Sequence, residues 1–320
     1  MKKYSRRDIL RVGAYLASGI GLAGSQHEAI CAGLEKIADR KEQVVWLHGM
    51  SCSGCSVSFL NAEEPGPVEI LTDMLSLVYH PTISAAQGNT AMDVVKHAVQ
   101  SKDYFLVVEG AVPIGIPEAC VVGGRPFADT LESAARNAKA VVTAGTCAAF
   151  GGIPAAEGNE TGAVSVRQFM EHRKIPIENR LINCPGCPVH PQTLLGTLAY
   201  VIGKGLPKLD SELLTPDMYC DHSVHDECPK FHYWEKREFA KHFGDEGCLF
   251  ELGCLGPLSM ASCSRRRWNG GVNWCIGAGA PCTACSSNEF AQRRDFPFYR
   301  KGEDPHAASN TAADRGGTTS

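Results

Sequence analysis

The segment from His225 to Cys285 constrains the fold of this chain more than any other stretch. It holds seven of the fifteen cysteines in less than a fifth of the length, and glycine and proline interrupt it repeatedly. Such a segment cannot bury enough apolar surface in regular elements to offset the entropy of ordering it. Bonds to sulfur must therefore hold it together. The seven cysteines are Cys228, Cys248, Cys254, Cys263, Cys275, Cys282 and Cys285.

Three kinds of bond could involve these thiols. Disulfides suit an exported protein, but an odd number of cysteines and close Cys-x-x-Cys pairs are poor geometry for structural bridges. Zinc modules usually pair two Cys-x-x-Cys motifs, and this segment has one, from Cys282 to Cys285. Iron-sulfur clusters take three or four thiolates from unevenly spaced loops. The spacing therefore favours iron-sulfur clusters over zinc.

Residues 1–32 are typical of a twin-arginine (Tat) export signal. A basic start that contains Arg6 and Arg7 precedes a weakly apolar, glycine-containing run from Val12 to Ala23. The run is too short to span a bilayer, and the alternative is a basic surface helix. The Tat route carries folded proteins, so it suits a chain whose cofactors are inserted in the cytoplasm. We expect a periplasmic protein, cleaved between Gly24 and about Gly33.

Residues 43–205 alternate between strand and helix patterns. This alternation predicts a doubly wound parallel sheet, an α/β fold of the flavodoxin-like kind. Residues 206–300 are predicted to form an irregular, cluster-bearing C-terminal domain, and the polar tail 301–320 to be disordered. The expected strands are Gln43–His48, Tyr104–Glu109, Ala140–Gly145 and Arg180–Asn183, and the expected helices include Ala91–Ser101, Pro126–Lys139, Val164–Lys174 and Gln192–Lys204.

Cysteines follow three of the predicted strands. In parallel sheets, ligands bind beyond the carboxyl ends of the strands, so these thiols are expected at one edge. Four thiolates there would hold one four-iron cluster. The set comprises Cys52, Cys55, Cys147 and one of Cys184 or Cys187.

Each of these signals has a simpler alternative. The Cys184–Cys187 pair alone could be a thioredoxin-like redox motif. Glu109 could line the same edge or be a solvated carboxylate. We interpret His48 as a packed or exposed histidine rather than a ligand, because thiolates already suffice.

The C-terminal segment supplies two further sets of ligands. His225 lies three residues before Cys228, and Cys248 and Cys254 can complete a His-Cys-Cys-Cys set. The other set is Cys263, Cys282 and Cys285, with Cys275 available as a fourth ligand. The run Arg265-Arg266-Arg267-Trp268 between them could be a solvated loop, or it could place guanidinium groups near anionic clusters or at a subunit contact.

Together these motifs resemble the small subunit of nickel-iron hydrogenases, over roughly Gln43 to Tyr299. The resemblance implies that Cys52, Cys55, Cys147 and Cys187 bind a proximal 4Fe-4S cluster. It implies a distal 4Fe-4S cluster on His225, Cys228, Cys248 and Cys254, and a medial cluster on Cys263, Cys282 and Cys285. The medial cluster is 3Fe-4S where the family has proline at the position of Cys275, and the cysteine here could hold a fourth iron. This cysteine also resembles the nickel-iron-selenium branch.

Gly54 and Gly152 stand where oxygen-tolerant members have extra cysteines, so an ordinary proximal cluster is expected. Cys184, Cys120 and Cys220 are expected to be buried thiols outside the clusters.

The resemblance also implies what this chain does and does not do. It lacks the paired Cys-x-x-Cys motifs of the nickel site, so hydrogen would be activated in a large subunit. This chain would relay electrons from the proximal to the medial to the distal cluster, and a c-type cytochrome is the expected acceptor. The net charge of −4 gives no sign of the basic surface that binds nucleic acid. No transmembrane anchor is expected. The alternatives are a stand-alone iron-sulfur electron carrier and a zinc-stabilised binding module.

Overall fold

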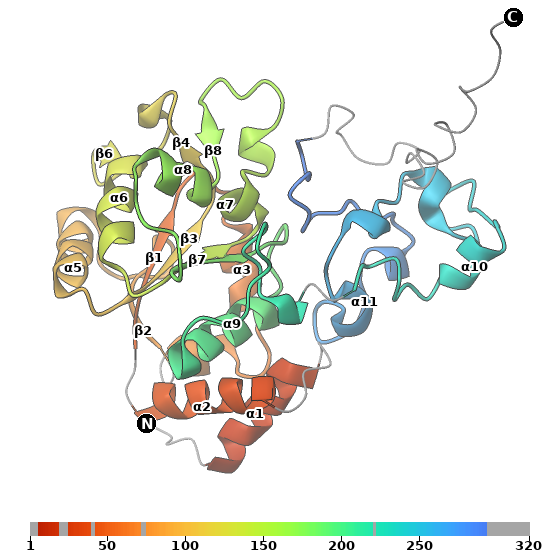
Figure 1. Cartoon of the computed structure of the whole chain (residues 1–320), viewed down its shortest axis with the longest axis horizontal. Helices are drawn as coiled ribbons and strands as arrows, with labels where there is room; N and C mark the ends of the chain where they lie inside the picture. The colour runs from red at the N-terminus through yellow and green to blue at the C-terminus, as the bar shows by residue number, and fades with distance from the viewer. Residues whose placement is uncertain (1–5, 19–24, 40–41, 72–74, 220–221, 293–320) are drawn as a thin grey trace, which may run out of the picture.

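The computed structural model describes residues 6–18, 25–39, 42–71, 75–219 and 222–292. Figure 1 shows an α/β unit that carries the sheet, with a smaller unit of loops and short helices beside it. The two N-terminal helices, α1 (Arg6–Ser18) and α2 (Ser25–Asp39), lie against the outside of the α/β unit. Among the described residues, no helix is long and apolar enough to cross a membrane.

A five-stranded parallel sheet forms the centre of the α/β unit. Its strand order, β2-β1-β3-β7-β9, is the doubly wound order of flavodoxin-like folds. The predicted fold class is therefore confirmed. The strands are β1 (Gln43–His48), β2 (Ser76–Tyr79), β3 (Phe105–Glu109), β7 (Val141–Ala144) and β9 (Leu181–Cys184).

Helices cover both faces of the sheet, and the predicted helices form with ends shifted by up to three residues. The helices of this unit are α3 (Gly54–Leu60), α4 (Pro67–Glu69), α5 (Gly88–Ser101), α6 (Phe127–Asn137), α7 (Thr146–Phe150), α8 (Val166–His172) and α9 (Pro191–Lys204). Two small antiparallel pairs lie outside the sheet: β4 (Val112–Pro113) with β8 (Ala163–Val164), and β5 (Val121–Val122) with β6 (Arg125–Pro126).

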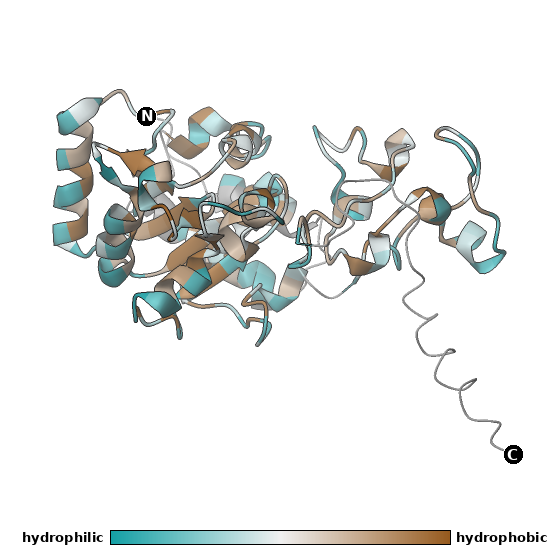
Figure 2. Ribbon diagram, turned by 90° about the horizontal axis from the view of Figure 1, so that it is seen from above, coloured by the Kyte–Doolittle hydropathy of each residue, from teal (hydrophilic) through white to brown (hydrophobic). Residues whose placement is uncertain are grey.

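The sheet separates two hydrophobic clusters because successive strand residues point to opposite faces. Trp46 and Val107 belong to the cluster that includes α9, whereas Leu47 and Val108 belong to the cluster that includes α5 and α6. Burial on both faces explains why the strands read as continuous apolar runs. In Figure 2 the strands are accordingly brown between helices with teal outer faces.

The C-terminal unit has little regular structure, as its sequence predicts. Its α-helices in the described part are α10 (Phe231–Glu235) and α11 (Cys263–Arg266), short 3-10 turns add a few residues, and irregular loops make up the rest. Its own buried cluster is small and contains Val224, Ala240, Leu249, Cys254, Trp274 and Ile276. So few buried apolar residues cannot account for the order of this unit.

Replacing Val107 by alanine should destabilise the protein by about 2–3 kcal/mol, because this side chain is fully buried in the central strand. Val121→Ala is the matched control, since Val121 is 51% exposed and should change stability by less than about 0.5 kcal/mol. Thermal unfolding of the two variants, followed by circular dichroism, measures the difference. Equal losses of stability would contradict the assigned core.

Candidate iron-sulfur sites

Four cysteines gather at the carboxyl edge of the sheet. Cys52 and Cys55 follow β1, Cys147 lies in α7 just after β7, and Cys187 follows β9. These thiols lie close enough for a negative charge on one sulfur to act on the next. Cys55 interacts electrostatically in this way with Cys147 and Cys187, and each of these interacts with Cys52. The structure thus brings together the four predicted proximal ligands.

Burial raises the pKa of Cys55, Cys147 and Cys187. The pKa of Cys187 rises to about 12, first because the side chain is desolvated and then because of the neighbouring thiols. A positive ion reverses this effect, because a coordinating thiol is deprotonated by the metal. A group of four neighbouring thiols suits metal binding better than a solvated redox pair does.

Glycines form the wall around this group of thiols. A Cβ atom on Gly145 would lie 2.3 Å from the sulfur of Cys55, and one on Gly152 would lie 2.9 Å from the sulfur of Cys147. Both glycines also have positive φ angles, +89° and +52°, which other residues rarely adopt. Any side chain there would fill the space beside the sulfurs. The cradle therefore fits a group that is held by these thiols.

Glu109 lies beneath the proximal thiols and is buried rather than solvated. Its carboxylate accepts hydrogen bonds from the Cys55 amide at 3.1 Å, from Ser51 Oγ at 2.9 Å and from Ser56 Oγ at 2.6 Å. His48 Nε2 lies 3.0 Å from the same carboxylate. Burial alone would raise the pKa of Glu109, but the contacts with His48, Ser56 and Ser51 hold the pKa below its usual value.

Two of our expectations are resolved by this network. Glu109 lines the edge, and His48 is packed against Ser56 and Glu109. Sequence reasoning missed His80, which is fully buried and hydrogen-bonded to Ser56 at 3.0 Å. Burial lowers the pKa of His80 to about 4.

The predicted distal ligands also come together. Cys254 is coupled to Cys248 and to Cys228, and burial raises its pKa to about 11. His225 adjoins this group, since a Cβ atom on Gly256 would lie 3.6 Å from both the Cys254 sulfur and the His225 amide nitrogen.

Aromatic rings support the distal group from one side. The His225 imidazole lies 5.0 Å from the ring of Phe231 and 5.1 Å from that of Trp234, both edge-on. Trp234 in turn lies 4.7 Å from Phe250. These contacts hold the imidazole by packing, and we had not predicted them.

The third group lies between the other two. Cys263 interacts electrostatically with Cys285 and Cys275, and Cys282 interacts in the same way with Cys285 and Cys263. Burial raises the pKa of Cys263 to about 12, whereas Cys275 is exposed. Cys275 is therefore placed with the three predicted medial ligands.

The three groups form one continuous series. Cys187 of the proximal group is coupled to Cys285 of the medial group, and Cys282 of the medial group is coupled to Cys254 of the distal group. The backbone joins them too: Thr146 donates a hydrogen bond to the Cys285 carbonyl, and the Cys282 amide donates to the Cys254 sulfur at 3.4 Å.

The arginines of the run 265–267 differ in their surroundings: one is buried, and two are exposed. Arg266 is buried, stacks on Tyr219 at 5.2 Å and is coupled to Cys263. Arg265 is exposed and pairs with Glu227 at 2.8 Å, and Arg267 is exposed. The Arg266 guanidinium therefore lies near the medial thiols.

Three further cysteines, Cys184, Cys120 and Cys220, are those that we expected to be buried thiols outside the clusters. Cys184 is fully buried in β9, and Cys120 is half-buried, with its pKa raised by burial. Cys220 lies outside the described residues. Within the described ranges, no three His, Cys, Asp or Glu side chains are gathered closely enough to hold one metal ion. Thiolates of a cluster bind different irons, so they lie further apart than the ligands of one ion.

Comparison with known proteins agrees with this geometry. The family described as NADH ubiquinone oxidoreductase, 20 Kd subunit, matches residues 52–201, and the C-terminal family of NiFe/NiFeSe hydrogenase small subunits matches residues 220–299. The periplasmic [NiFeSe] hydrogenase small subunit of Desulfomicrobium baculatum is 38% identical over 315 residues, covering 92% of this chain and 98% of that one. The periplasmic [NiFe] hydrogenase small subunit 1 of Nitratidesulfovibrio vulgaris is 37% identical, covering 92% and 93%.

Solved structures give the same result. The reduced, active Ni-Fe-Se hydrogenase of Desulfomicrobium baculatum matches with a TM-score of 0.77 and 39% identity, over 82% of this chain and 100% of that one. The recombinant [NiFeSe] hydrogenase of Desulfovibrio vulgaris Hildenborough matches with a TM-score of 0.75 and 36% identity, over 82% and 98%. This chain belongs to the NiFe/NiFeSe hydrogenase small-subunit family. It is an electron-transferring subunit, and the predicted resemblance is confirmed.

Glu109→Gln should lower stability by about 3 kcal/mol, because it leaves buried donors around a neutral amide and removes the partner of His48. Glu118→Gln, at an exposed carboxylate, is the control and should be close to neutral. Anaerobic urea unfolding of the purified protein measures both. A Glu109 variant as stable as the control would show that this network does not support the proximal loops.

Proposed function

We propose that this chain conducts electrons through three iron-sulfur clusters between the hydrogen-activating centre of a nickel-containing large subunit and an external acceptor. The observation that carries the proposal is the unbroken series of three thiol groups, joined by the hydrogen bonds from Thr146 to the Cys285 carbonyl and from the Cys282 amide to the Cys254 sulfur. A series of this kind suits stepwise transfer of single electrons, which is the chemistry that iron-sulfur clusters supply.

The proximal cluster is assigned to Cys52, Cys55, Cys147 and Cys187 and is placed on the side of the large subunit. Cys52 is exposed, and Val57 in the following helix is 57% exposed. An exposed apolar side chain beside a redox site is consistent with a covering partner. Glycine at positions 54 and 152 supports an ordinary 4Fe-4S cluster there.

The medial cluster is assigned to Cys263, Cys275, Cys282 and Cys285. The coupling of Cys275 to Cys263 and to Cys285 supports a fourth ligand and hence a 4Fe-4S cluster. Without Cys275, the three remaining thiolates would suit a 3Fe-4S cluster.

The distal cluster is assigned to His225, Cys228, Cys248 and Cys254, and the electrons leave there to a c-type cytochrome. The imidazole ligand suits the end of the series, where the acceptor must approach closely. His232 and Arg237 are exposed on the same short helix and turn that carry Trp234, so this face is accessible in the isolated chain.

Amide groups of this chain would adjust the reduction potentials. Hydrogen bonds to cluster sulfurs favour the more negative, reduced state. Val189 donates its amide to the Cys55 sulfur at 3.5 Å, and Ala284 donates to the Cys282 sulfur at 3.4 Å. The protein therefore has a separate means of adjusting the proximal and the medial potential.

The proposal extends to the location of the protein. Residues 1–32 serve as a Tat signal, and the mature complex acts in the periplasm, as the names of its relatives state for them. Helix α2 crosses position 32, so cleavage at that point would divide a helix. The domain limits 43–205 and 206–300 stay predictions, and the tail 301–320 lies outside the described residues.

Cys275→Pro should convert the medial cluster from a 4Fe-4S to a 3Fe-4S form, because the fourth iron loses its ligand. The oxidised 3Fe-4S form is paramagnetic, so the oxidised variant should gain an electron paramagnetic resonance signal. Cys120→Ala, which removes a thiol outside the groups, is the control and should leave the spectrum unchanged. An unchanged Cys275 variant would exclude Cys275 as a ligand.

Purification of the complex from its native source tests the function as a whole. The chain should co-purify with a nickel-containing subunit, and the complex should reduce a c-type cytochrome when hydrogen is supplied. Iron without nickel, a partner or hydrogen-dependent reduction would instead indicate a stand-alone electron carrier.

A further inference from the structure

Arg266 is a buried cation beside the medial thiols. It lies three residues after Cys263 in helix α11, and residues with this spacing share one face of a helix. Arg266 is only 7% exposed, whereas Arg265 and Arg267 on either side of it are exposed. The Arg266 guanidinium therefore lies inside the protein, next to a proposed ligand of the medial cluster.

Two uncharged groups hold the guanidinium in place. Its Nη1 donates a hydrogen bond to Thr193 Oγ1 at 2.9 Å, and its carbon lies 5.2 Å from the centre of the Tyr219 ring. Burial raises the pKa of Tyr219 to about 12, so the phenol is neutral at neutral pH. Both contacts lie outside residues 1–32, so removal of the proposed export signal would leave them in place.

The residues that hold the guanidinium adjoin the medial thiols. Thr193 and Tyr219 line a small cavity of about 40 Å³, and Cys263 and Cys285 line the same cavity. The position of Arg266 is therefore fixed with respect to two of the medial thiols, from both its own helix and the residues that it contacts.

Arg266 keeps its positive charge in this position. Burial lowers its pKa to about 10, which still leaves the guanidinium protonated at neutral pH. Ion pairs in the described part of the chain include Arg265 with Glu227 at 2.8 Å, but none of them involves Arg266. A buried charge is costly unless an opposite charge lies close by. The group that can supply this opposite charge is the medial set of thiols.

We propose that Arg266 is the counter-charge of the medial cluster and raises its reduction potential. The inference deepens the proposed function and rests on it. A cluster that is held by thiolates is anionic, and each electron that it receives adds one negative charge. A fixed positive charge nearby therefore stabilises the reduced form. Burial strengthens this effect, because the protein interior screens charges less than water does.

The consequence for electron transfer concerns the first step of the proposed series. A higher medial potential favours transfer of an electron from the proximal to the medial cluster. Arg266 would thus act on the medial cluster by its charge, whereas the amide of Ala284 acts by a hydrogen bond to the Cys282 sulfur at 3.4 Å.

A purely structural role is the alternative, because Arg266 also joins the two units through Thr193 of α9. Such a role would need the hydrogen bond and the ring contact of the guanidinium rather than its charge. Lysine and methionine separate the two roles. Their side chains are similar in length, and neither reproduces the planar guanidinium, but lysine alone keeps the charge.

Redox titration of the purified complex, followed by electron paramagnetic resonance, tests the charge. The Cys275→Pro variant is the background, because its medial 3Fe-4S cluster should give a signal of its own when oxidised. Adding Arg266→Met should lower the ratio of reduced to oxidised medial cluster at a fixed potential about tenfold, which is about 59 mV for a one-electron couple. Adding Arg266→Lys instead should change this ratio less than about twofold.

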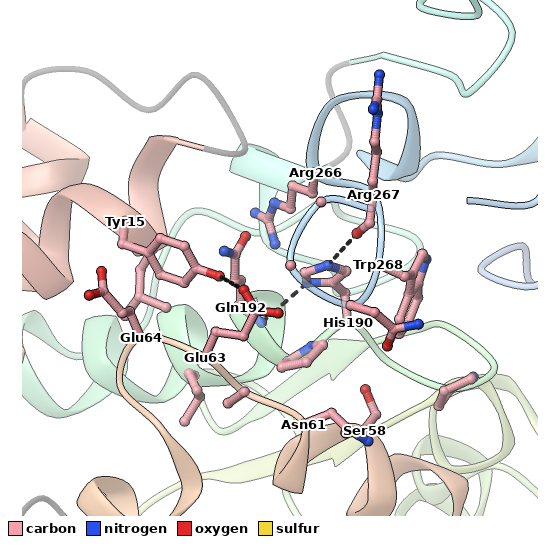
Figure 3. A pocket seen from close by; sticks show the side chains of 18 of the residues that line it. Tyr15, Ser58, Asn61, Glu63, Glu64, His190, Gln192, Arg266, Arg267 and Trp268 are labelled. Atoms are coloured by element: carbon pink, nitrogen blue, oxygen red, sulfur yellow. Dashed lines mark hydrogen bonds between the residues drawn. The ribbon is translucent and has the colours of Figure 1, made fainter. Parts of the chain in front are cut away.

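Arg267→Met in the same background is the matched control. Arg266 and Arg267 both line a cavity of about 360 Å³. Figure 3 shows the Arg267 side chain extending away from His190 and Trp268, whereas the Arg266 guanidinium is turned toward Gln192. Loss of the exposed charge at Arg267 should change the ratio less than about twofold, because water and salt screen it.

Two results would overturn the inference: a medial potential that is the same with arginine and methionine at position 266, or equal shifts with methionine and lysine. Arg266→Gln is a second neutral variant, which keeps a polar group for Thr193, and the same fall is expected from it if methionine disrupts the loop. A Cys275→Pro background without a 3Fe-4S signal would instead contradict the medial assignment in the proposed function.

Discussion

We propose that the C-terminal unit depends on bonds to its thiols. Its described part buries few apolar side chains of its own, and its short helices and turns contribute little regular hydrogen bonding. The ordered positions of Cys254, Cys263 and Cys282 are consistent with clusters that fix the loops from within. Ligand bonds would here replace the hydrophobic core, and the groups proposed to fold the unit are those that would carry electrons.

The α/β unit holds its cysteine-bearing loops in a different way. Its parallel strands deliver three loops to one edge, and the buried Glu109 network holds the first of these loops by bonds to Ser51, Ser56 and the Cys55 amide. The joint between the units is also polar, since His190 contacts the Arg267 carbonyl at 2.9 Å. Different interactions therefore hold the proximal loop and the contact between the two units.

Much of the fold and of the proximal thiol group could be predicted from the sequence, because the sequence signals were local. Apolar runs such as Val44 to Leu47 predicted the central strands, and cysteines at their ends predicted the proximal group. The β2 strand was missed because four residues, of which one is fully buried, give no clear period. The packing of α2 on α9 and the ring contacts of Trp234 could not be predicted, because they depend on residues far apart in sequence that meet only in the fold. The role of Glu109 stayed open for the same reason, since burial decides it.

The central claim is that three iron-sulfur clusters, rather than zinc, occupy the three thiol groups. Iron, acid-labile sulfide and zinc per chain of the purified complex test it most directly. Three clusters predict about twelve irons per chain, with equivalent sulfide and no stoichiometric zinc. Zinc in place of iron, or iron for only one cluster, would contradict the account.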